Sequence, residues 1–309
     1  MPGTTYEYRS SPMSGFQDKN ARPDRIPSLL ADIALAGNWT IARSSEGSSE
    51  RTFVARQQDR AVFVKLGDRN PARERLAELG ITPPLLATGE HDGAPFSVYE
   101  FVPGRHPDPA WIADHRLDIA DIILAFQQDG ALADALGGIP DIILAKHLDE
   151  VLRETIISIQ MASSPRLHAP EVAHAITRLT QRTGAVDDQP LVPSHTDPNN
   201  TNLLVATERA YLIDWDGITW SEPLRDIGLM LWWYIPEARW RDVLLRMDVP
   251  EPGIEGATER VHWWSAINSL RVALWIDRNV PDEGAIASFL EDLFAAEARR
   301  PNPKRRVSK

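Results

Sequence analysis

A polar loop in the second half of the chain carries the residues best suited to chemistry. It contains His195 and Asp197, and it reaches an amide side chain at Asn202. A strand-like segment follows, and a second loop then supplies a carboxylate at Asp214. Phosphoryl transfer requires a base that orients a hydroxyl group, together with amide and carboxylate oxygens that hold Mg²⁺ against phosphates. The order of residue types therefore predicts Asp197 as the base and Asn202 and Asp214 as the metal ligands.

Each of these residues also has an ordinary structural explanation. An Asp or Asn in a loop is most often there because its side chain accepts turn hydrogen bonds. The ordered combination of His-x-Asp, a later Asn and an Ile-Asp-Trp segment is far more specific, and it lies downstream of a β-rich region that carries one strand lysine, Lys65. The combination, rather than any single member, indicates a phosphoryl-transfer site.

The elements that must position these residues change in character along the chain. β-branched and aromatic runs separated by turn residues predict an antiparallel meander between residues 39 and 101, with short helices at 26–36 and 71–79. From residue 109 onward, apolar residues with helical spacing predict helices at 110–128, 147–161, 170–182, 223–235, 237–246, 257–278 and 282–298. We therefore expect an α+β fold.

Four segments are expected. Residues 1–25 lack apolar periodicity and are interpreted as a loose leader, and residues 26–101 as a small β-rich lobe. Residues 102–298 form a larger helical lobe, and a ligand cleft between the two lobes is the default expectation. Residues 299–309 carry six basic groups and two prolines, a composition that favours a solvated tail over a binding element.

Composition excludes several classes of protein. The chain has 309 residues, of which 43% are hydrophobic, so most of it can fold around a core. Its formal net charge of −11 disfavours nucleic acid and anionic membrane as partners. The absence of cysteine excludes disulfides and thiolate chemistry. The longest uncharged apolar stretch, 227–236, is too short to cross a bilayer, and no secretory signal is visible. A cytoplasmic protein is expected.

The full constellation resembles the aminoglycoside phosphotransferase and choline kinase family, whose members are relatives of the protein kinases. The resemblance rests on His195-x-Asp197-x₄-Asn202 and on Ile213-Asp214-Trp215, and it extends over roughly residues 37–235. It implies a protein-kinase-like bilobal fold and an enzyme that moves the γ-phosphoryl group of ATP to an alcohol, with Mg²⁺ as cofactor. The sequence does not distinguish ATP from GTP.

The resemblance also implies a set of nucleotide-binding residues. Lys65 takes the place of the family's phosphate-binding lysine, although a strand lysine can also be an exposed solubilising residue. Its acidic partner is expected on the helix that follows, where Glu74 is preferred over Glu78. The small residues of a loop between two strands are expected to approach phosphate through their N–H groups, although a plain hairpin turn explains them equally well: Gly47, Ser48 and Ser49.

The segment that joins the lobes resembles the family's adenine-binding hinge. The Glu100 carbonyl and the Val102 amide are the expected contacts, and Leu204 and Ile213 are the expected apolar floor beneath the base. The same two apolar side chains would serve equally as ordinary core residues.

Two further residues are expected to support the polar loop. His195 is interpreted as a structural organiser rather than as a general base. Asp226 matches a family aspartate that braces the loop through hydrogen bonds, although a carboxylate at a helix N-terminus has the same local appearance. Only twelve positions separate Asp214 from Asp226, which leaves no room for the long activation segment of a protein kinase. A constitutively formed small-molecule kinase is therefore expected.

The acceptor is the least constrained part of the prediction. Acidic residues in the helical region would suit an amino-bearing, cationic acceptor such as an aminoglycoside, unless they form a solvated face: Asp216, Glu222, Glu237, Asp149, Glu150 and Glu154. Trp215 and Trp220 follow the metal loop and are expected to line the pocket, although tryptophans at helical spacing are more often core residues. The alternatives are a kinase for choline, ethanolamine, an amino sugar or homoserine, and a nucleotide-binding module without catalysis. The oligomeric state is not specified.

Overall fold

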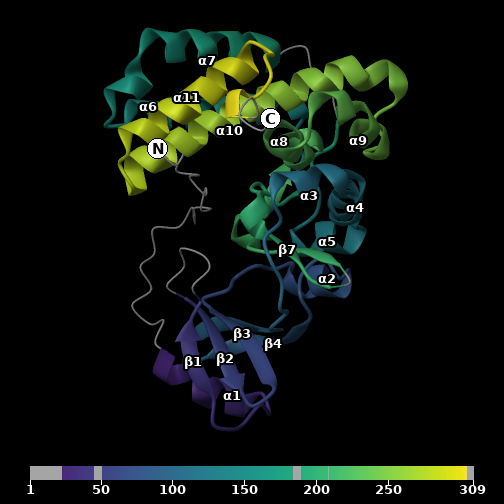
Figure 1. Ribbon diagram of the computed structural model, residues 1–309, viewed down its shortest axis with the longest axis vertical. Helices are drawn as coiled ribbons and strands as arrows, with labels where there is room; N and C mark the ends of the chain where they lie inside the picture. The colour runs from purple at the N-terminus through teal and green to yellow at the C-terminus, as the bar shows by residue number, and fades with distance from the viewer. Residues whose placement is uncertain (1–22, 45–50, 184–188, 208, 305–309) are drawn as a thin grey trace.

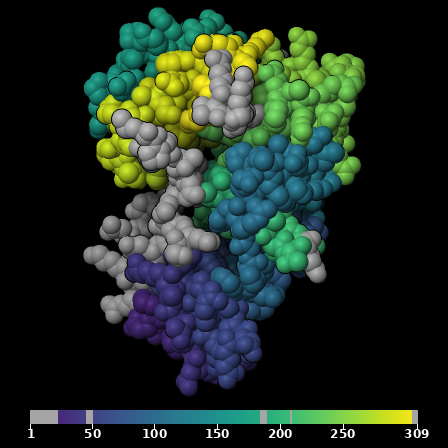
Figure 2. All heavy atoms as spheres, viewed as in Figure 1, coloured from purple at the N-terminus to yellow at the C-terminus, as the bar shows by residue number. Residues whose placement is uncertain are grey.

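The computed structural model describes residues 23–44, 51–183, 189–207 and 209–304. Figure 1 shows a small sheet lobe at one end of the molecule and a larger helical lobe at the other, with strand β7 and helix α2 where the two lobes meet. The same division is visible in Figure 2, where the purple and dark-blue sheet lobe lies beneath the green and yellow helical lobe. The predicted α+β, bilobal architecture is confirmed.

The sheet lobe directs one lysine toward the helical lobe. It is a five-stranded antiparallel sheet in the order β1-β2-β3-β5-β4. Its strands are β1 (Thr40–Arg43), β2 (Thr52–Gln57), β3 (Arg60–Leu66), β4 (Leu85–His91) and β5 (Ala94–Glu100). Val62 and Val64 of β3 are buried in a cluster with α1 (Ile26–Asp32). Because side chains alternate across a strand, Lys65 projects from the opposite face.

The helical lobe is built around two long helices near the C-terminus. Its helices are α3 (Pro109–Asp114), α4 (Arg116–Gln127), α5 (Gly130–Ala135), α6 (Leu144–Gln160), α7 (Pro170–Thr183), α8 (Leu224–Tyr234), α9 (Trp240–Arg246), α10 (Ile254–Asn279) and α11 (Glu283–Glu297). Helix α10 packs against both α11 and α8. Trp232 of α8 and Trp264 of α10 are among the largest fully buried side chains, so both helices contribute an aromatic ring to the core of this lobe.

Two short ribbons lie between the helices and the sheet lobe. Strand β6 (Val192–Ser194) pairs with β9 (Thr219–Ser221), and β7 (Leu203–Val205) pairs with β8 (Ala210–Leu212), both in antiparallel orientation. These ribbons carry the two polar loops that the sequence singled out.

Two expectations about the helices were wrong in detail. The predicted helix at 110–128 is two helices, α3 and α4, because the backbone turns at His115, whose ring stacks on Trp111 at 3.9 Å. Helix α5 was not predicted.

Within the described residues, no helix combines the length and the apolar character that a membrane span requires.

Helix α2 (Arg73–Glu78) packs with the helical lobe although its sequence position places it within the β-rich segment. Leu76 and Ile81 belong to the large core cluster of the helical lobe. The Arg75 guanidinium donates to both carboxylate oxygens of Asp129, at 2.9 and 2.6 Å, and this aspartate caps α5. Helix α2 therefore belongs to the core of the helical lobe, and the two hydrophobic cores are not separated by a single boundary near residue 101.

The first part of the basic tail is docked on the helical lobe. Asn302 is buried and donates to the Trp232 carbonyl, and the Lys304 ammonium lies 2.7 Å from a carboxylate oxygen of Asp292. A solvated tail is therefore the wrong description for residues 299–304. Residues 305–309 and the leader up to residue 22 lie outside the described part of the chain.

Candidate active site

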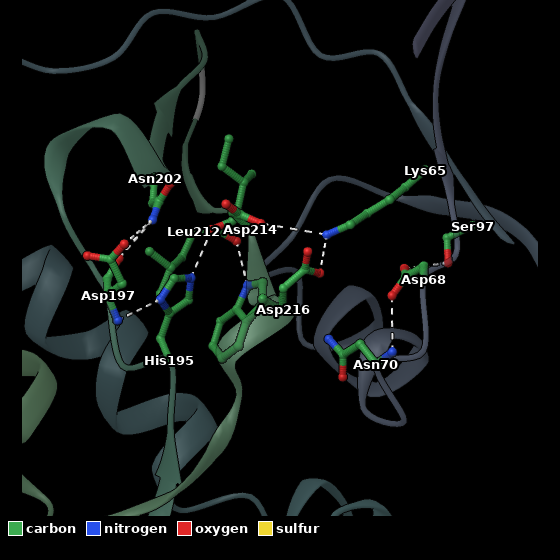
Figure 3. Close-up of polar contacts among 12 residues, drawn as sticks. Lys65, Asp68, Asn70, Ser97, His195, Asp197, Asn202, Leu212, Asp214 and Asp216 are labelled. Atoms are coloured by element: carbon green, nitrogen blue, oxygen red, sulfur yellow. Dashed lines mark hydrogen bonds and ion pairs between the residues drawn. The ribbon is translucent and has the colours of Figure 1, made fainter. Parts of the chain in front are cut away.

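The β7–β8 hairpin brings the two proposed metal ligands to one end. Leu203 pairs with Leu212, so Asn202 comes just before one strand and Asp214 follows shortly after the other. The N–H of Ile213 donates to the Asn202 carbonyl at 2.8 Å and closes this end of the hairpin. Figure 3 shows Asn202, Asp214 and Asp197 gathered here, with Lys65 reaching in from the sheet lobe.

Asp226 binds the backbone of the loop that carries Asp197. Its fully buried carboxylate accepts hydrogen bonds from the N–H groups of His195 and Thr196, at 2.8 and 2.9 Å, and from the Ser194 hydroxyl at 2.9 Å. The Thr196 backbone has a φ of +73°, a left-handed conformation that a β-branched residue rarely adopts. The three hydrogen bonds that Asp226 accepts compensate for this strain and fix the position of the backbone that leads into Asp197.

His195 connects the two polar loops. Its Nε2 lies 2.8 Å from the Ile213 carbonyl, and the N–H of Asp197 donates to its Nδ1 at 3.3 Å. This pattern requires a proton on Nε2 and none on Nδ1. Burial lowers the pKa of the imidazole, although Asp226 and Asp214 oppose that effect, and the ring is only 1% exposed. Both ring nitrogens are engaged, so His195 orders the loops rather than exchanging protons with a ligand.

Asp197 is held in a partly buried position with a raised pKa. Burial raises the pKa of its carboxyl to about 7, and the nearby negative charge of Asp214 adds to this effect. A 2.9 Å hydrogen bond from the Asn199 side chain lowers the pKa in opposition. A carboxylate whose pKa lies near neutrality accepts a proton more readily than an ordinary aspartate, as a general base requires.

The donors at the end of the hairpin suit Mg²⁺. The Asn202 amide nitrogen donates to the Asp197 carbonyl at 2.8 Å, which leaves the amide oxygen as the atom available to a cation. The Asp214 side chain is 41% exposed. Carboxylate and amide oxygens are the hard ligands that Mg²⁺ prefers. No group of three or more metal-binding His, Cys, Asp or Glu side chains was found among the described residues. The donor set thus fits a cation that takes its remaining ligands from phosphate and water.

Lys65 bridges the sheet lobe to the metal loop. Its ammonium forms ion pairs with Asp216 and, at 3.6 Å, with Asp214. Burial alone lowers the pKa of the ammonium, but the carboxylates of Asp216, Asp214 and Asp68 outweigh it and raise the pKa above its ordinary value. Lys65 is therefore a permanent positive charge facing the proposed metal ligands, as Figure 3 shows. Asp216, expected to bind the acceptor, instead binds this lysine.

The expected partners of Lys65 on α2 are not in contact with it. Glu74 and Glu78 are both exposed, and Glu78 pairs with Arg75 at 2.9 Å. Because α2 is anchored on the helical lobe, its acidic residues do not reach β3. The structure brings Asp68 near Lys65 instead. Asp68 is 3% exposed and accepts a 2.6 Å hydrogen bond from Ser97, which pairs with Lys65 across the sheet.

Asp68 was missed by the sequence reasoning. A signal was available, because this aspartate follows directly after β3 and Gly67, three positions beyond the lysine. An acidic residue so close to the end of the strand could have been weighed as its partner.

The two tryptophans expected to line the pocket lie in different places. Trp215 is 4% exposed, donates its indole N–H to the Leu212 carbonyl at 2.8 Å and lies edge-on to the ring of Phe126. It is a core residue beneath the loops, so its expected contact with the acceptor is wrong. Trp220 is half-buried against the helical core. The loop residues Gly47, Ser48 and Ser49 lie outside the described part of the chain.

The segment that joins the lobes runs beside β7. Arg105 and Val205 exchange two backbone hydrogen bonds, of 3.0 and 2.9 Å. Gly104 lies so close to Leu204 that an added Cβ would stand 2.7 Å from a methyl carbon of that side chain. Leu204 and Ile213 are both half-buried, as a floor beneath a ligand would be.

The hinge backbone offers an unused donor. The N–H groups of Glu100 and Phe101 donate to the carbonyls of Pro84 and Ala61, at 2.9 and 3.2 Å. Within the described chain, the Val102 N–H has no hydrogen-bond partner. A flat ligand lying on Leu204 could therefore be held by this amide.

Comparisons with known proteins identify the family and the fold. A model of the phosphotransferase enzyme family matches residues 38–262. The choline kinase LicA from Streptococcus pneumoniae is 15% identical with a TM-score of 0.64, and the match covers 89% of this chain and 98% of that one. A thermostable mutant of aminoglycoside phosphotransferase APH(4)-Ia, in complex with ADP and hygromycin B, is 13% identical with a TM-score of 0.63 and the same coverage.

A third similar structure contains a different nucleotide. The GDP complex of a mutant aminoglycoside 2′-phosphotransferase-IIIa is 17% identical with a TM-score of 0.63, and the match covers 90% of this chain and 98% of that one. At these identities the similarity establishes a shared fold.

Proposed function

This chain belongs to the phosphotransferase enzyme family, and on that premise we propose that it transfers the γ-phosphoryl group of ATP to a hydroxyl group of a small molecule. The observation that carries the proposal is the convergence of Asp197, Asn202 and Asp214 at one end of a hairpin, with the ammonium of Lys65 facing them. Phosphoryl transfer makes use of all four side chains.

In the proposed reaction the acceptor oxygen forms a bond to the γ-phosphorus while the bond between that phosphorus and ADP breaks. Asp197 orients the acceptor hydroxyl and takes its proton. The Lys65 ammonium leaves its ion pairs with Asp214 and Asp216 and binds the phosphates instead. Asn202 and Asp214 would hold Mg²⁺, which supplies positive charge against the phosphates when it is bound. Positioning and electrostatic stabilisation supply most of the rate enhancement.

The nucleotide base would lie between the lobes. The unpartnered N–H of Val102 and the carbonyl of Glu100 would pair with the edge of the base, and Leu204 and Ile213 would support its face. The similar structures that contain ADP and GDP support a nucleotide as the phosphoryl donor.

The acceptor was expected to be amino-bearing, such as an aminoglycoside. Several acidic groups behind that expectation are engaged elsewhere: Asp216 binds Lys65, and the fully buried Glu222 lies 3.0 Å from the Arg260 guanidinium. Glu150 and Glu154 on α6 still support an amine, since the charge of Glu150 acts on His147 and that of Glu154 acts on Arg225. A small metabolic alcohol is the second candidate. Two arginines near His147, Arg225 and Arg271, favour an acceptor of this kind that also carries an anionic group.

The proposal is tested by following ADP release with Mg²⁺ and ATP or GTP. The acceptor panel contains aminoglycosides, choline, ethanolamine, amino sugars and homoserine. Asp197→Asn and Asp197→Ala are expected to lose about 10²- to 10⁴-fold in turnover, the range for removal of a general base. Near wild-type turnover in either variant would refute the role of Asp197. Nucleotide binding without turnover on any acceptor would favour a non-catalytic module.

A further inference from the structure

Arg225 is a buried cation close to the proposed base. Arg225 is only 7% exposed, and its guanidinium lies over the Trp264 ring, 5.0 Å from the ring centre. One of its nitrogens donates a long hydrogen bond of 3.4 Å to the Ser221 hydroxyl. Within the described residues it forms no ion pair with a carboxylate.

Two other buried charges in the helical lobe are paired. Glu222 lies against Arg260 at 3.0 Å, and Asp292 lies against Lys304 at 2.7 Å. Burying a charge is costly unless a partner of opposite charge offsets the loss of water. Arg225 departs from this pattern, because no carboxylate among the described residues forms an ion pair with it.

Arg225 is the neighbour of the residue that holds the base loop. It occupies the first turn of α8, directly before Asp226, whose carboxylate binds the loop that leads into Asp197. Burial, and to a smaller extent the charge of Arg271, lower the pKa of the guanidinium to about 10, although Asp226 and Asp197 oppose them. The charges of Arg225 and Asp197 thus act on each other.

A second arginine lies on the same side. Arg271 is two turns beyond Trp264 on α10, so both side chains lie on one face of that helix. Figure 1 shows α8 and α10 packed together in the helical lobe. Arg271 is half-buried, and within the described chain it has neither a hydrogen bond nor an ion pair.

Two neutral polar groups complete the surroundings. The Nε2 of His147 lies 3.2 Å from the Ser221 hydroxyl, the same hydroxyl that Arg225 contacts. Burial lowers the pKa of His147 to about 4, and Arg225 and Arg271 contribute to that shift, so the imidazole is neutral at pH 7. The four residues Arg225, Arg271, His147 and Ser221 are called the arginine cluster below.

The acidic groups that face the arginine cluster do not satisfy it. Glu150 and Glu154 act on it only through longer-range charge, and neither forms an ion pair with an arginine of the cluster. The cluster therefore combines two guanidinium groups with hydroxyl and imidazole groups in one corner beside the base. Guanidinium groups bind carboxylates and phosphates through pairs of charge-assisted hydrogen bonds.

We propose that the arginine cluster binds an oxyanion, a carboxylate or a phosphate, carried by the same acceptor molecule whose hydroxyl group Asp197 orients. This inference rests on the proposed function and narrows its acceptor. The acceptor is a hydroxy acid, a hydroxy amino acid or a phosphorylated alcohol, rather than a molecule that carries only positive charge. The oxyanion supplies the ion-pair partner that Arg225 lacks among the described residues.

The test uses acceptors in pairs that differ by one anionic group. L-serine is compared with ethanolamine and L-homoserine with aminopropanol, so that each pair differs by a carboxylate. Glycerol phosphate is compared with glycerol, a pair that differs by a phosphate. We expect the wild-type enzyme to favour the anionic member of at least one pair by about 10-fold or more in kcat/KM. The carboxylate and phosphate pairs separate the two sources of the oxyanion.

Arg271→Gln is the principal variant. Because Arg271 is only half-buried, the replacement does not leave a fully buried polar group without a partner. It should raise KM for the anionic acceptor about 10- to 100-fold, the loss expected for one charged hydrogen-bond partner. KM for the member of the pair that lacks the anionic group should stay within about two-fold. Arg278→Gln is the matched control, because Arg278 lies two turns further along the same helix and is exposed. Arg225→Lys and Arg225→Gln extend the series.

A purely structural role for Arg225, through stabilisation of the charge on Asp197, makes a different prediction. Its variants would then lower kcat equally for both members of a pair and leave both KM values unchanged. That result, or equal KM values for both members in the wild-type enzyme, would overturn the proposal.

A binding measurement separates this inference from the proposed function. The anionic member of the favoured pair should raise the thermal unfolding midpoint of the wild-type protein more than its partner does, and this difference should vanish in Arg271→Gln. Absence of turnover on every acceptor would refute the proposed function, while the midpoint difference would still decide whether the arginine cluster binds an oxyanion.

Discussion

The Asp226 carboxylate holds Thr196 in a left-handed backbone conformation by accepting a 2.9 Å hydrogen bond from its N–H. Thr196 directly precedes the proposed base, so the geometry of this hydrogen bond sets the direction in which Asp197 leaves the loop. The carboxylate comes from α8, a helix packed deep in the helical lobe. The reactive loop therefore takes its rigidity from the core.

Asp226→Asn should damage both the fold and the reaction. The amide keeps the shape of the carboxylate, but its nitrogen would face an N–H donor and leave that donor unpaired. We expect a loss of about 1–3 kcal/mol in the free energy of unfolding. Turnover should fall about 10²-fold, because a misplaced Asp197 orients its substrate poorly. Chemical denaturation and ADP release measure the two effects.

Ser194→Ala is the control for Asp226→Asn, since it removes one of the three hydrogen bonds and leaves the two backbone contacts in place. It should cost about 1 kcal/mol. Wild-type turnover in Asp226→Asn would mean that the loop keeps its conformation without the carboxylate.

Gly217 and Thr196 should be energetically coupled. A Cβ added to Gly217 would stand 2.7 Å from the Thr196 hydroxyl oxygen, too close for ordinary contact. Gly217→Ala is therefore expected to push the metal loop away from the base loop and to lower turnover. In a Thr196→Ala background the obstructing oxygen is gone, so the same change should cost less. A double-mutant cycle should yield a coupling of about 0.5–3 kcal/mol. Additive effects would exclude the predicted clash.

The sequence was sufficient for residues whose roles depend on local pattern. The alternation of apolar residues in β3 identifies a strand with Lys65 on its polar face, and the short hairpin fixes the relation of Asn202 to Asp214. In both cases neighbours in sequence, or residues on one ribbon, determine the geometry. Asp226 lies on a separate helix, and only the resemblance to the kinase family connected it with the loop.

Tertiary packing decided the residues that sequence reasoning misplaced. The helix bearing Glu74 was predicted, but its sequence does not say that Leu76 would be buried in the helical lobe and carry the acid away from Lys65. Trp215 follows a metal ligand and so suggested a pocket. The left-handed backbone at Asp214, with φ of +63°, turns the next residue inward, and its large apolar surface stabilises the core.

The pH dependence of kcat/KM should report the raised pKa of Asp197. The base must be ionised, so activity should fall as the pH drops below about 7. Asn199→Ala removes a hydrogen-bond donor that favours the ionised form, and the acid limb should therefore move to higher pH. Asn200→Ala is the matched control, because this side chain contacts Tyr234 rather than the base. Profiles measured between pH 5 and 9 that show no acid limb near neutrality would contradict the assignment.

Asp197→Asn should stabilise the protein, and the gain should depend on pH. The carboxyl has a pKa of about 7 in the folded protein against an ordinary value near 4, because burial disfavours its charge. The unfolded chain therefore releases this proton at lower pH than the folded chain does, and the wild-type protein loses stability as the pH rises from about 4 to about 7. An asparagine has no proton to release, so the variant avoids this loss.

The difference in unfolding midpoint between Asp197→Asn and the wild-type protein should thus be small near pH 4.5, grow through pH 7 and stay constant above it. Asp134→Asn serves as the matched control for the substitution, since Asp134 is exposed and lies on α5, outside the base loop. Thermal unfolding at pH 5, 6, 7 and 8 provides the measurement. A midpoint difference for Asp197→Asn that is the same at pH 5 and pH 8 would show that the folded protein does not perturb this carboxyl, and would remove the physical basis for its role as a base at neutral pH.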